Sequence, residues 1–110
     1  MEFLVEFEVN VPDGVPSSEI EARNRAEASA AARLADEGHL LRLWKPPAAP
    51  AETKALGLYR AEGEAQLTDL LRALPLYDWM NITVTPLEAH PNDPIPRRAS
   101  RQPGGAGNEQ

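Results

Sequence analysis

Apolar and polar residues alternate along the first eleven positions of the chain. In the run "EFLVEFEVNV", which covers residues 2–11, the odd positions are apolar and most of the even positions are acidic or polar. A period of two residues is typical of a strand that places one face in a core. The run also lacks a basic start, a long apolar stretch and a small-residue cleavage site, so it predicts a strand and not a signal peptide.

Two later segments have the spacing of helices. Residues 17–37 are rich in alanine, begin with the capping signal "SSEI" and are followed by Gly38, where a left-handed cap is wanted. Residues 62–75 carry leucines three and four positions apart and stop at Pro75. The leucines are Leu67, Leu70, Leu71 and Leu74. The sequence therefore predicts two helices with an apolar stripe on each.

Three more segments are expected to be strands. They read "HLLRLWK" (39–45), "KALGLYRA" (54–61) and "WMNITVTPL" (79–87), and "PPAAP" separates the first two because consecutive prolines cannot join a sheet interior. The order strand, helix, strand, strand, helix, strand predicts an α+β fold of the ferredoxin-like βαββαβ type. Such a fold has a four-stranded antiparallel sheet with two helices on one face. We expect this domain to span residues 1–90, with residues 91–110 as a Pro/Gly-rich C-terminal arm or tail.

The face of the sheet away from the helices is expected to be partly apolar. Strand alternation assigns to it Leu4, Leu40, Trp44, Ala55, Gly57 and Tyr59, mixed with Glu6, Glu8, Arg42 and Thr83. A surface of this kind is too apolar in places to remain in water. Aromatic and arginine side chains are also common anchors of interfaces. We therefore expect a homo-oligomer that is at least a dimer.

Composition narrows the class of protein. A chain of 110 residues with 42% hydrophobic residues is the size of one compact domain. It contains no cysteine, which removes disulfides and thiolate chemistry and fits a reducing cytoplasm. No stretch is long enough to span a membrane. The net charge of −6 repels phosphate backbones, and the densest basic run, "PRRASR" at 96–101, lies in the expected tail, so we expect no nucleic acid partner.

Glu27 is unusually placed for a surface carboxylate. If the stripe of the first helix runs through Ile20, Ala31 and Leu34, spacings of three and four residues put Asn24 and Glu27 on the same stripe. A carboxylate in an apolar pocket has a raised pKa and can serve as a general base. In the alternative, the helix is slightly rotated and Glu27 pairs with Arg23 at the rim.

Other candidate site residues lie near strand ends. His39 and Lys45 share strand parity with Leu41 and Leu43, so they either face the helices or simply reach water. Tyr59 is a possible proton donor, although its parity points it away from the helices. His90 could cover a pocket.

The sequence shows none of the common cofactor and metal motifs. It has no glycine-rich phosphate loop, no G-x-S-x-G turn and no H-E-x-x-H, and its two histidines are far apart. What remains is chemistry without a cofactor that uses carboxylate, imidazole or ammonium groups, or plain binding. Proton transfer next to a carbonyl is the reaction class that such groups support best.

Three stretches resemble the muconolactone isomerase family. They are "RLADEGHLLRLWK" (33–45), "LPLYDWM" (74–80) and "VTPLEAHPNDP" (84–94). Members of that family are short ferredoxin-like chains with a helix ending in E-G, a strand containing L-W-R or L-W-K, an "LPL" step and a final "HP". The resemblance spans roughly residues 1–92. It implies an isomerase of aromatic catabolism that moves the ring double bond of muconolactone in the β-ketoadipate route, in a closed oligomer, typically a decamer, whose C-terminal segment covers a neighbour's pocket.

The resemblance also suggests roles for individual residues. Glu27 lies where the family keeps a helix glutamate, which makes it the expected base of a 1,3-proton shift through a dienolate. His39 is the second catalytic candidate, and Lys45, Asn24 and Tyr59 are the expected substrate-binding residues. Lys45 replaces the family's arginine, so it keeps the charge but cannot bind a carboxylate with two parallel hydrogen bonds. The stretch 46–61 is longer than the family's G-x-Y-A-N-Y-S-V-F and lacks its asparagine. These departures favour a different lactone or carbonyl substrate.

Two other functions fit the same fold. One is a non-catalytic oligomeric protein that binds a small molecule in a retained pocket. The other is a cofactor-free oxygenase or cyclase on a dimeric barrel. A pocket with Glu27 buried beside a cation would favour the isomerase, whereas an interior filled by side chains would favour a binding or structural role.

Overall fold

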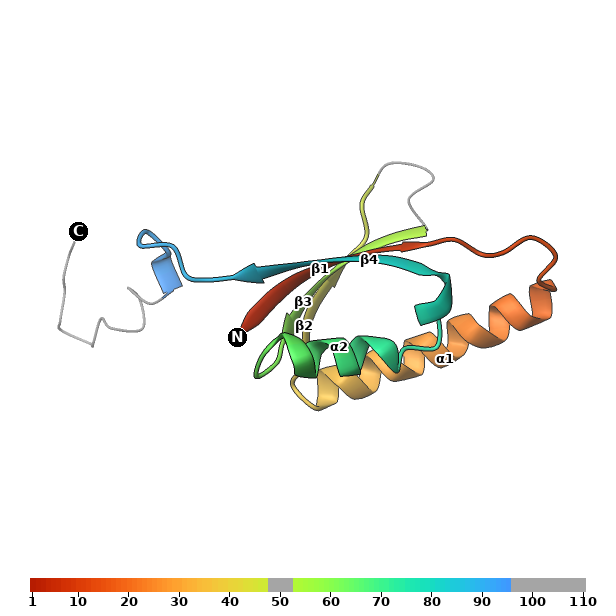
Figure 1. The fold of residues 1–110 in the computed structure, drawn as a ribbon, viewed down its shortest axis with the longest axis horizontal. Coiled ribbons are helices and arrows are strands. Elements are labelled where there is room, and N and C mark those ends of the chain that lie inside the picture. Colours follow the sequence, from red (N-terminus) through yellow and green to blue (C-terminus); the bar gives the residue numbers. More distant parts are fainter. Residues whose placement is uncertain (48–52, 96–110) are drawn as a thin grey trace.

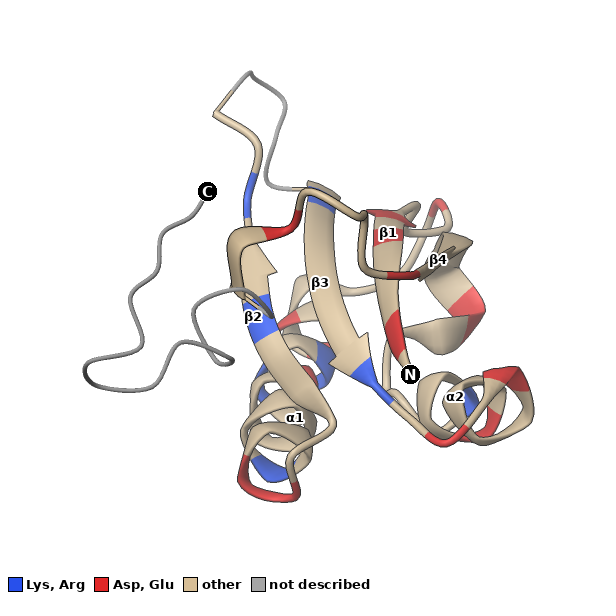
Figure 2. Ribbon diagram, turned by 90° about the vertical axis from the view of Figure 1, so that its left-hand side faces the viewer, with Lys and Arg blue, Asp and Glu red and all other residues tan. Residues whose placement is uncertain are grey.

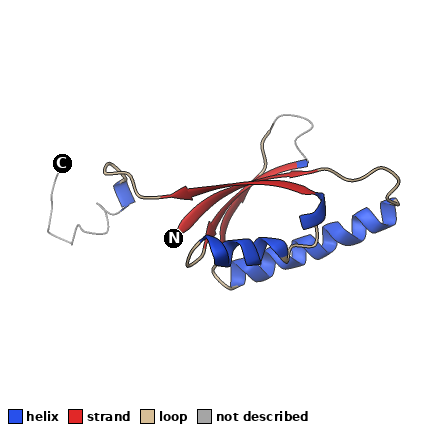
Figure 3. Cartoon of the chain, in the orientation of Figure 1, coloured by secondary structure: helices blue, strands red, loops and turns tan. Residues whose placement is uncertain are grey.

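The computed structural model of the chain describes residues 1–47 and 53–95. The elements are β1 (Glu2–Val9), α1 (Ser17–Asp36), β2 (Leu40–Trp44), β3 (Lys54–Arg60), α2 (Glu64–Arg72), η2 (Tyr77–Trp79) and β4 (Met80–Leu87). The strands form one antiparallel sheet in the order β2-β3-β1-β4. Both helices cover the same face of this sheet (Figures 1 and 3). The predicted ferredoxin-like α+β fold is confirmed.

The core lies between the helices and the two central strands. The alternating face of β1 supplies Phe3 and Val5, whose side chains are fully shielded from solvent. Leucines of α2 and of the turn after it pack onto them, together with small and branched residues from the second half of α1. These buried residues are Leu67, Leu71, Leu74, Ala30 and Leu34. The period-two pattern and the leucine spacing of residues 62–75 therefore indicated the core correctly, except that β1 ends at Val9 and Val11 lies beyond it, 40% exposed.

The ends of α1 agree only in part with the sequence signals. At the C-terminus, Gly38 has a φ of +83° and His39 donates its backbone N–H to the carbonyl of Leu34, so the predicted left-handed cap is present. At the N-terminus, Pro16 is the capping residue, and it makes no side-chain cap hydrogen bond. Ser17 already lies in the first turn. The "SSEI" signal thus marked the right place, but its serines do not act as the cap.

The sequence analysis placed the wrong side of β3 toward the helices. In the antiparallel pairing, Phe3 lies opposite Tyr59 and Val5 lies opposite Gly57. Directly opposed residues share one face of a sheet, so Tyr59, Gly57 and Ala55 face the helices. Leu56 and Leu58 take the open face instead. Both faces of β3 carry apolar residues, and alternation alone could not tell which face was inside.

The face assigned to Leu40 is wrong for a different reason. The register of β2 against β3 shifts between Leu40 and Arg42, which is the signature of a bulge that inserts one extra residue. Leu40 pairs with Tyr59 and Leu43 pairs with Gly57, so both leucines lie on the helix side. Arg42 and Trp44 lie on the open face, as predicted.

The open face of the sheet combines apolar and charged side chains. Leu4, Trp44, Leu56 and Leu58 lie on it beside Glu6, Glu8 and Arg42. Trp44 is 40% exposed and lies under the guanidinium of Arg42, 5.0 Å from its ring centroid. Figure 2 shows acidic residues on β1 and a basic residue on β2. In this single chain, therefore, the sheet presents a mixed surface to solvent.

The segment after β4 runs away from the sheet (Figure 1). Residues 91–95 are described and the basic part of the expected tail, residues 96–110, lies outside the described residues. The division into a domain of residues 1–90 and an arm of residues 91–110 stays a prediction. Within the part of the chain that is described, neither helix is both long and apolar enough to cross a bilayer.

Candidate active site

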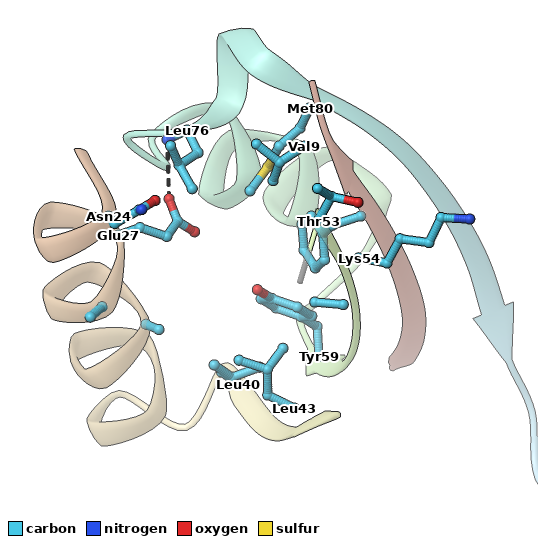
Figure 4. Close-up of a pocket in the computed structure, with 14 residues that line it drawn as sticks. Val9, Asn24, Glu27, Leu40, Leu43, Thr53, Lys54, Tyr59, Leu76 and Met80 are labelled. Atoms are coloured by element: carbon cyan, nitrogen blue, oxygen red, sulfur yellow. Dashed lines mark hydrogen bonds between the residues drawn. The ribbon is translucent and has the colours of Figure 1, made fainter. Parts of the chain in front are cut away.

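A cavity of about 280 Å³ lies between the first helix and the sheet. It is near the lower end of the sizes usual for ligand pockets, roughly 300–1,000 Å³, and therefore suits a small molecule. Its walls are mostly apolar. They comprise Phe7, Val9, Ala28, Ala31, Leu40, Leu43, Ala55, Leu76 and Met80, with the polar residues Asn24, Glu27, Thr53, Lys54 and Tyr59 (Figure 4).

Glu27 extends from α1 into this cavity (Figure 4). Its side chain is half-buried, and its Oε1 accepts the backbone N–H of Leu76 at 3.1 Å. Burial raises the pKa of the Glu27 carboxyl above its ordinary value, and the hydrogen bond from Leu76 partly opposes that rise. The helix stripe predicted this position of Glu27, and the structure confirms it.

Arg23 is linked to Glu27 through a peptide group and not by direct pairing. Its guanidinium donates to the carbonyl of Pro75 at 3.2 Å, and the N–H of the same peptide unit, that of Leu76, donates to Glu27. Arg23 also lies over the Trp79 ring at 4.2 Å from the centroid. A cation at the carbonyl end polarises the peptide and strengthens the N–H as a donor to the carboxylate.

Tyr59 forms the wall of the cavity opposite α1. Its side chain is 3% exposed and packs against the Phe7 ring, with centroids 6.1 Å apart. The hydroxyl points across the cavity toward α1, the helix that carries Glu27 (Figure 4). Burial, and secondarily the negative charge of Glu27, raises the pKa of Tyr59 to about 12. The phenol is therefore protonated at neutral pH and can donate a hydrogen bond.

The structure brings together three of the five residues proposed from sequence. Asn24, Glu27 and Tyr59 line one cavity, with Asn24 exposed at its α1 side. His39 lies elsewhere, since its Nδ1 is 2.9 Å from the carbonyl oxygen of Arg60 and it lines a separate polar hollow beside the N-terminus. Lys45 is exposed and does not line the cavity.

His90 belongs to a local turn. Its Nδ1 accepts the backbone N–H of Asn92 at 3.0 Å, and its side chain is exposed. In residues 1–47 and 53–95, no group of three or more His, Asp or Glu side chains has the arrangement of a metal site. Within these residues, the two histidines therefore contribute neither to the cavity nor to a metal centre.

The sequence reasoning missed three contributors to the cavity. The backbone N–H of Leu76 has no sequence signature beyond the "LPL" step in which it lies. Thr53 immediately precedes β3 and Lys54 is its first residue, and the sequence analysis gave neither of them a role in the site. The ammonium of Lys54 points away from the cavity (Figure 4). Lys54 is nevertheless nearer to this cavity than Lys45, the cation expected from sequence.

Comparison with known proteins relates the chain to one family of isomerases. The family model described as muconolactone delta-isomerase matches residues 1–93. Muconolactone Delta-isomerase 1 of Acinetobacter lwoffii is 35% identical over 95 residues, which cover 84% of this chain and 93% of the relative. Muconolactone Delta-isomerase of Cupriavidus pinatubonensis is 30% identical over 92 residues, which cover 84% of this chain and 97% of the relative.

Solved structures agree with the sequence comparison. A crystal structure of muconolactone isomerase matches with a TM-score of 0.71 and 30% sequence identity, covering 84% of this chain and 93% of that chain. The 5-chloro-2-hydroxyhydroquinone dehydrochlorinase of Burkholderia phenoliruptrix, in complex with 2,5-dihydroxybenzoquinone, matches with a TM-score of 0.60, covering 82% of this chain and 96% of that chain. At 14% identity, this second likeness shows a shared fold alone. On its sequence and its fold, the chain belongs to the muconolactone delta-isomerase family and is an isomerase.

Proposed function

We propose that the protein shifts the ring double bond of a muconolactone-like unsaturated lactone, in the β-ketoadipate route of aromatic catabolism. The observation that carries this proposal is the half-buried carboxylate of Glu27, which faces a small and mostly apolar cavity. Such surroundings raise the basicity of a carboxylate, which is what proton abstraction from carbon requires. The relatives named muconolactone delta-isomerase supply the substrate class.

The reaction moves one proton between two carbons. The Glu27 carboxylate removes a proton from one end of a three-carbon unit conjugated with the lactone carbonyl. The electron pair of the broken C–H bond enters the ring, and the carbonyl π pair moves onto its oxygen, which gives a dienolate. When the pair returns, protonated Glu27 delivers the proton to the other end of the unit. No oxidation state changes, so a base and a hydrogen-bond donor are sufficient and we propose that no cofactor takes part.

The anionic arm of such a substrate needs a place away from Glu27. The cavity wall is largely apolar and Glu27 carries a negative charge, so a second carboxylate inside would be repelled. We place the arm beside Lys54, which lines the cavity. A flexible lysine side chain can turn its ammonium toward a bound anion without moving the strand. Lys45 is the more distant alternative.

A second copy of the chain is the proposed partner of the open sheet face. Leu4, Leu56, Leu58 and Trp44 offer the apolar area, and at about 25 cal/mol per Å² their burial would stabilise a dimer by several kcal/mol. A two-fold axis can bring Arg42 of one copy against Glu6 or Glu8 of the other. Light scattering at micromolar concentration tests this, because a particle of the 12.0 kDa chain mass would contradict the dimer and the decamer expected from the family.

Conversion of muconolactone is the test of the proposed activity. The purified protein is incubated with muconolactone and the ring protons are followed by ¹H NMR, with heat-denatured protein as the control. We expect the substrate signals to be replaced by those of the enol-lactone. Binding of muconolactone without any conversion would instead support the alternative, an oligomeric protein that binds a small molecule without catalysis.

A further inference from the structure

The Tyr59 ring lies directly against the backbone of Gly57. A Cβ atom at position 57 would stand 3.2 Å from Cδ1 of that ring, a tight contact, and 2.6 Å from Cε1, closer than carbon atoms can pack. Gly57 lies within β3 and is not one of the glycines with positive φ, so its backbone conformation does not require glycine. A glycine inside a strand often marks a close approach of another group. Here the group is the ring of Tyr59, two residues away on the same face.

The contact between the ring and the Gly57 backbone fixes the direction of the Tyr59 side chain. Phe7 packs against the ring, with an angle of 57° between the two planes, and the side chain is 3% exposed. Held in this way, the ring directs its hydroxyl across the cavity toward the helix of Glu27 (Figure 4). The carboxylate and the phenol therefore come from opposite walls and leave the space for a ligand between them.

Few other polar side chains can reach that space. Among the described residues that line the cavity, Asn24 is exposed on α1 and the ammonium of Lys54 points outward (Figure 4). Thr53 immediately precedes β3. Tyr59 is the polar side chain that is both buried and directed inward from the sheet, which gives it the position of a preorganised donor.

We propose that the Tyr59 hydroxyl donates a hydrogen bond to the substrate's carbonyl oxygen as that oxygen becomes negative, and that Gly57 is the positioning residue that makes room for its ring. This inference rests on the proposed function. Glu27 takes and returns the proton, while Tyr59 keeps its own proton throughout and stabilises the dienolate oxygen. The raised pKa of Tyr59 agrees with this division, since a neutral phenol donates and does not compete with Glu27 as a base.

The kinetic test compares two variants that retain the core. Tyr59→Phe keeps the ring and removes the hydroxyl, and loss of one such donor is expected to lower kcat roughly 100-fold with KM within about threefold. Tyr77→Phe is the matched control, because Tyr77 also packs against the core but does not line the cavity. Its kcat is expected to stay within about twofold of wild type. Thermal unfolding verifies that each variant is folded.

Gly57→Ala disturbs the contact between position 57 and the Tyr59 ring without removing the hydroxyl. The added methyl group displaces the ring, so kcat is expected to fall at least tenfold, roughly as for other small misplacements of a catalytic group. In the Tyr59→Phe background, Gly57→Ala is expected to lower kcat little further, because the hydroxyl it would misplace is already gone. Equal losses in both backgrounds would overturn the positioning role of Gly57.

A binding measurement separates this inference from the proposed function. Glu27→Gln imitates the protonated base, and tetronate, a lactone that carries an enolate oxygen, imitates the dienolate. We expect Glu27→Gln to bind tetronate and the Glu27→Gln/Tyr59→Phe double variant to bind it at least about tenfold more weakly. If wild type isomerises muconolactone and Tyr59→Phe is as active, the Tyr59 role is wrong and the isomerase stands. If wild type does not isomerise muconolactone, the proposed function fails. The donor role of Tyr59 is overturned as well if the two variants bind tetronate equally or if neither binds it.

Discussion

The two helices cover the same face of the sheet in different ways. Under α2, leucines pack closely against the sheet, and Leu67, Leu71 and the following Leu74 are between 1% and 5% exposed. Under α1, the corresponding wall carries Asn24, Glu27, Ala28 and Ala31, and a cavity of about 280 Å³ remains. Small and polar side chains do not reach the sheet, whereas leucines do.

This difference shows how one helix can stabilise the fold while the other provides the site. The buried leucines of α2 supply the close packing on which most of the stability of a small domain depends. The short alanine side chains of α1 fill less of the space above the sheet and leave a cavity large enough for a small ligand. Glu27 is tolerated there because the Leu76 N–H satisfies one of its oxygens.

The largest expected effect is on the free energy of unfolding when a buried leucine of α2 is truncated. Leu67→Ala removes a side chain that is 1% exposed, and creation of such a cavity is expected to lower the free energy of unfolding by about 2–5 kcal/mol. Thr68→Ala, on the exposed side of the same helix, should change it by less than about 0.5 kcal/mol. Urea denaturation measures both. A loss in Leu67→Ala no greater than in the control would contradict the role given to α2.

Filling the cavity beside α1 should lower activity and leave stability nearly unchanged. Ala31→Leu places a branched side chain in the cavity and is expected to lower kcat/KM roughly 100-fold through exclusion or misplacement of the substrate. Because it fills empty space, it should not lower the unfolding temperature by more than a few degrees. Ala32→Leu adds the same volume at an exposed position of α1 and is the control for both measurements. Full activity of Ala31→Leu would show that the substrate binds elsewhere.

A smaller effect is expected from the link between Arg23 and the base. Burial raises the pKa of Glu27, and only the carboxylate form is active, so kcat/KM should rise with pH through that pKa. Arg23→Met weakens the polarisation of the Leu76 N–H, which stabilises the carboxylate, so the acid limb should move to higher pH. Arg25→Met, at an exposed position, is the control. An acid limb that moves to lower pH, or equally in both variants, would rule out this link.

The smallest expected effect compares two lysines. Lys54→Met should raise the KM for an anionic lactone by no more than about fivefold with kcat unchanged, because exposed ion pairs contribute only about 0.2–1 kcal/mol. Lys45→Met should leave KM nearly unchanged, because Lys45 does not line the cavity. Steady-state kinetics on both variants decide between the lysines. A larger rise of KM in Lys45→Met would restore the sequence-based assignment.

The parts of the molecule that sequence patterns predicted are those where one pattern dominates. Residues 2–9 alternate with Leu4 as the one exception, and the leucines of α2 repeat at helical spacing, so their buried faces could be assigned from the sequence. Glu27 was found in the same way, as a charged residue on an apolar helix stripe. Local periodicity is sufficient when the opposite face of the element is clearly polar.

The errors arose where the face of a strand depends on its neighbours. Leu56 and Leu58 alternate with Ala55, Gly57 and Tyr59, so β3 is apolar on both sides and only its pairing with β1 decides which side is inside. The bulge in β2 shifts the parity between Leu40 and Arg42, which misled the assignment of Leu40. Backbone donors such as the Leu76 N–H depend on the path of the chain and have no residue type to reveal them.

The most direct test of the account follows proton transfer in Glu27→Gln. Wild type, Glu27→Gln and the exposed control Glu21→Gln are incubated with muconolactone in deuterated water, and deuterium at the ring carbons is followed by NMR. Wild type and Glu21→Gln are expected to convert the lactone at similar rates. Glu27→Gln should be slower by about 10²- to 10⁴-fold, as expected for loss of a general base, while it remains folded. A folded Glu27→Gln variant that isomerises the lactone at the wild-type rate would contradict the role of Glu27 as the base.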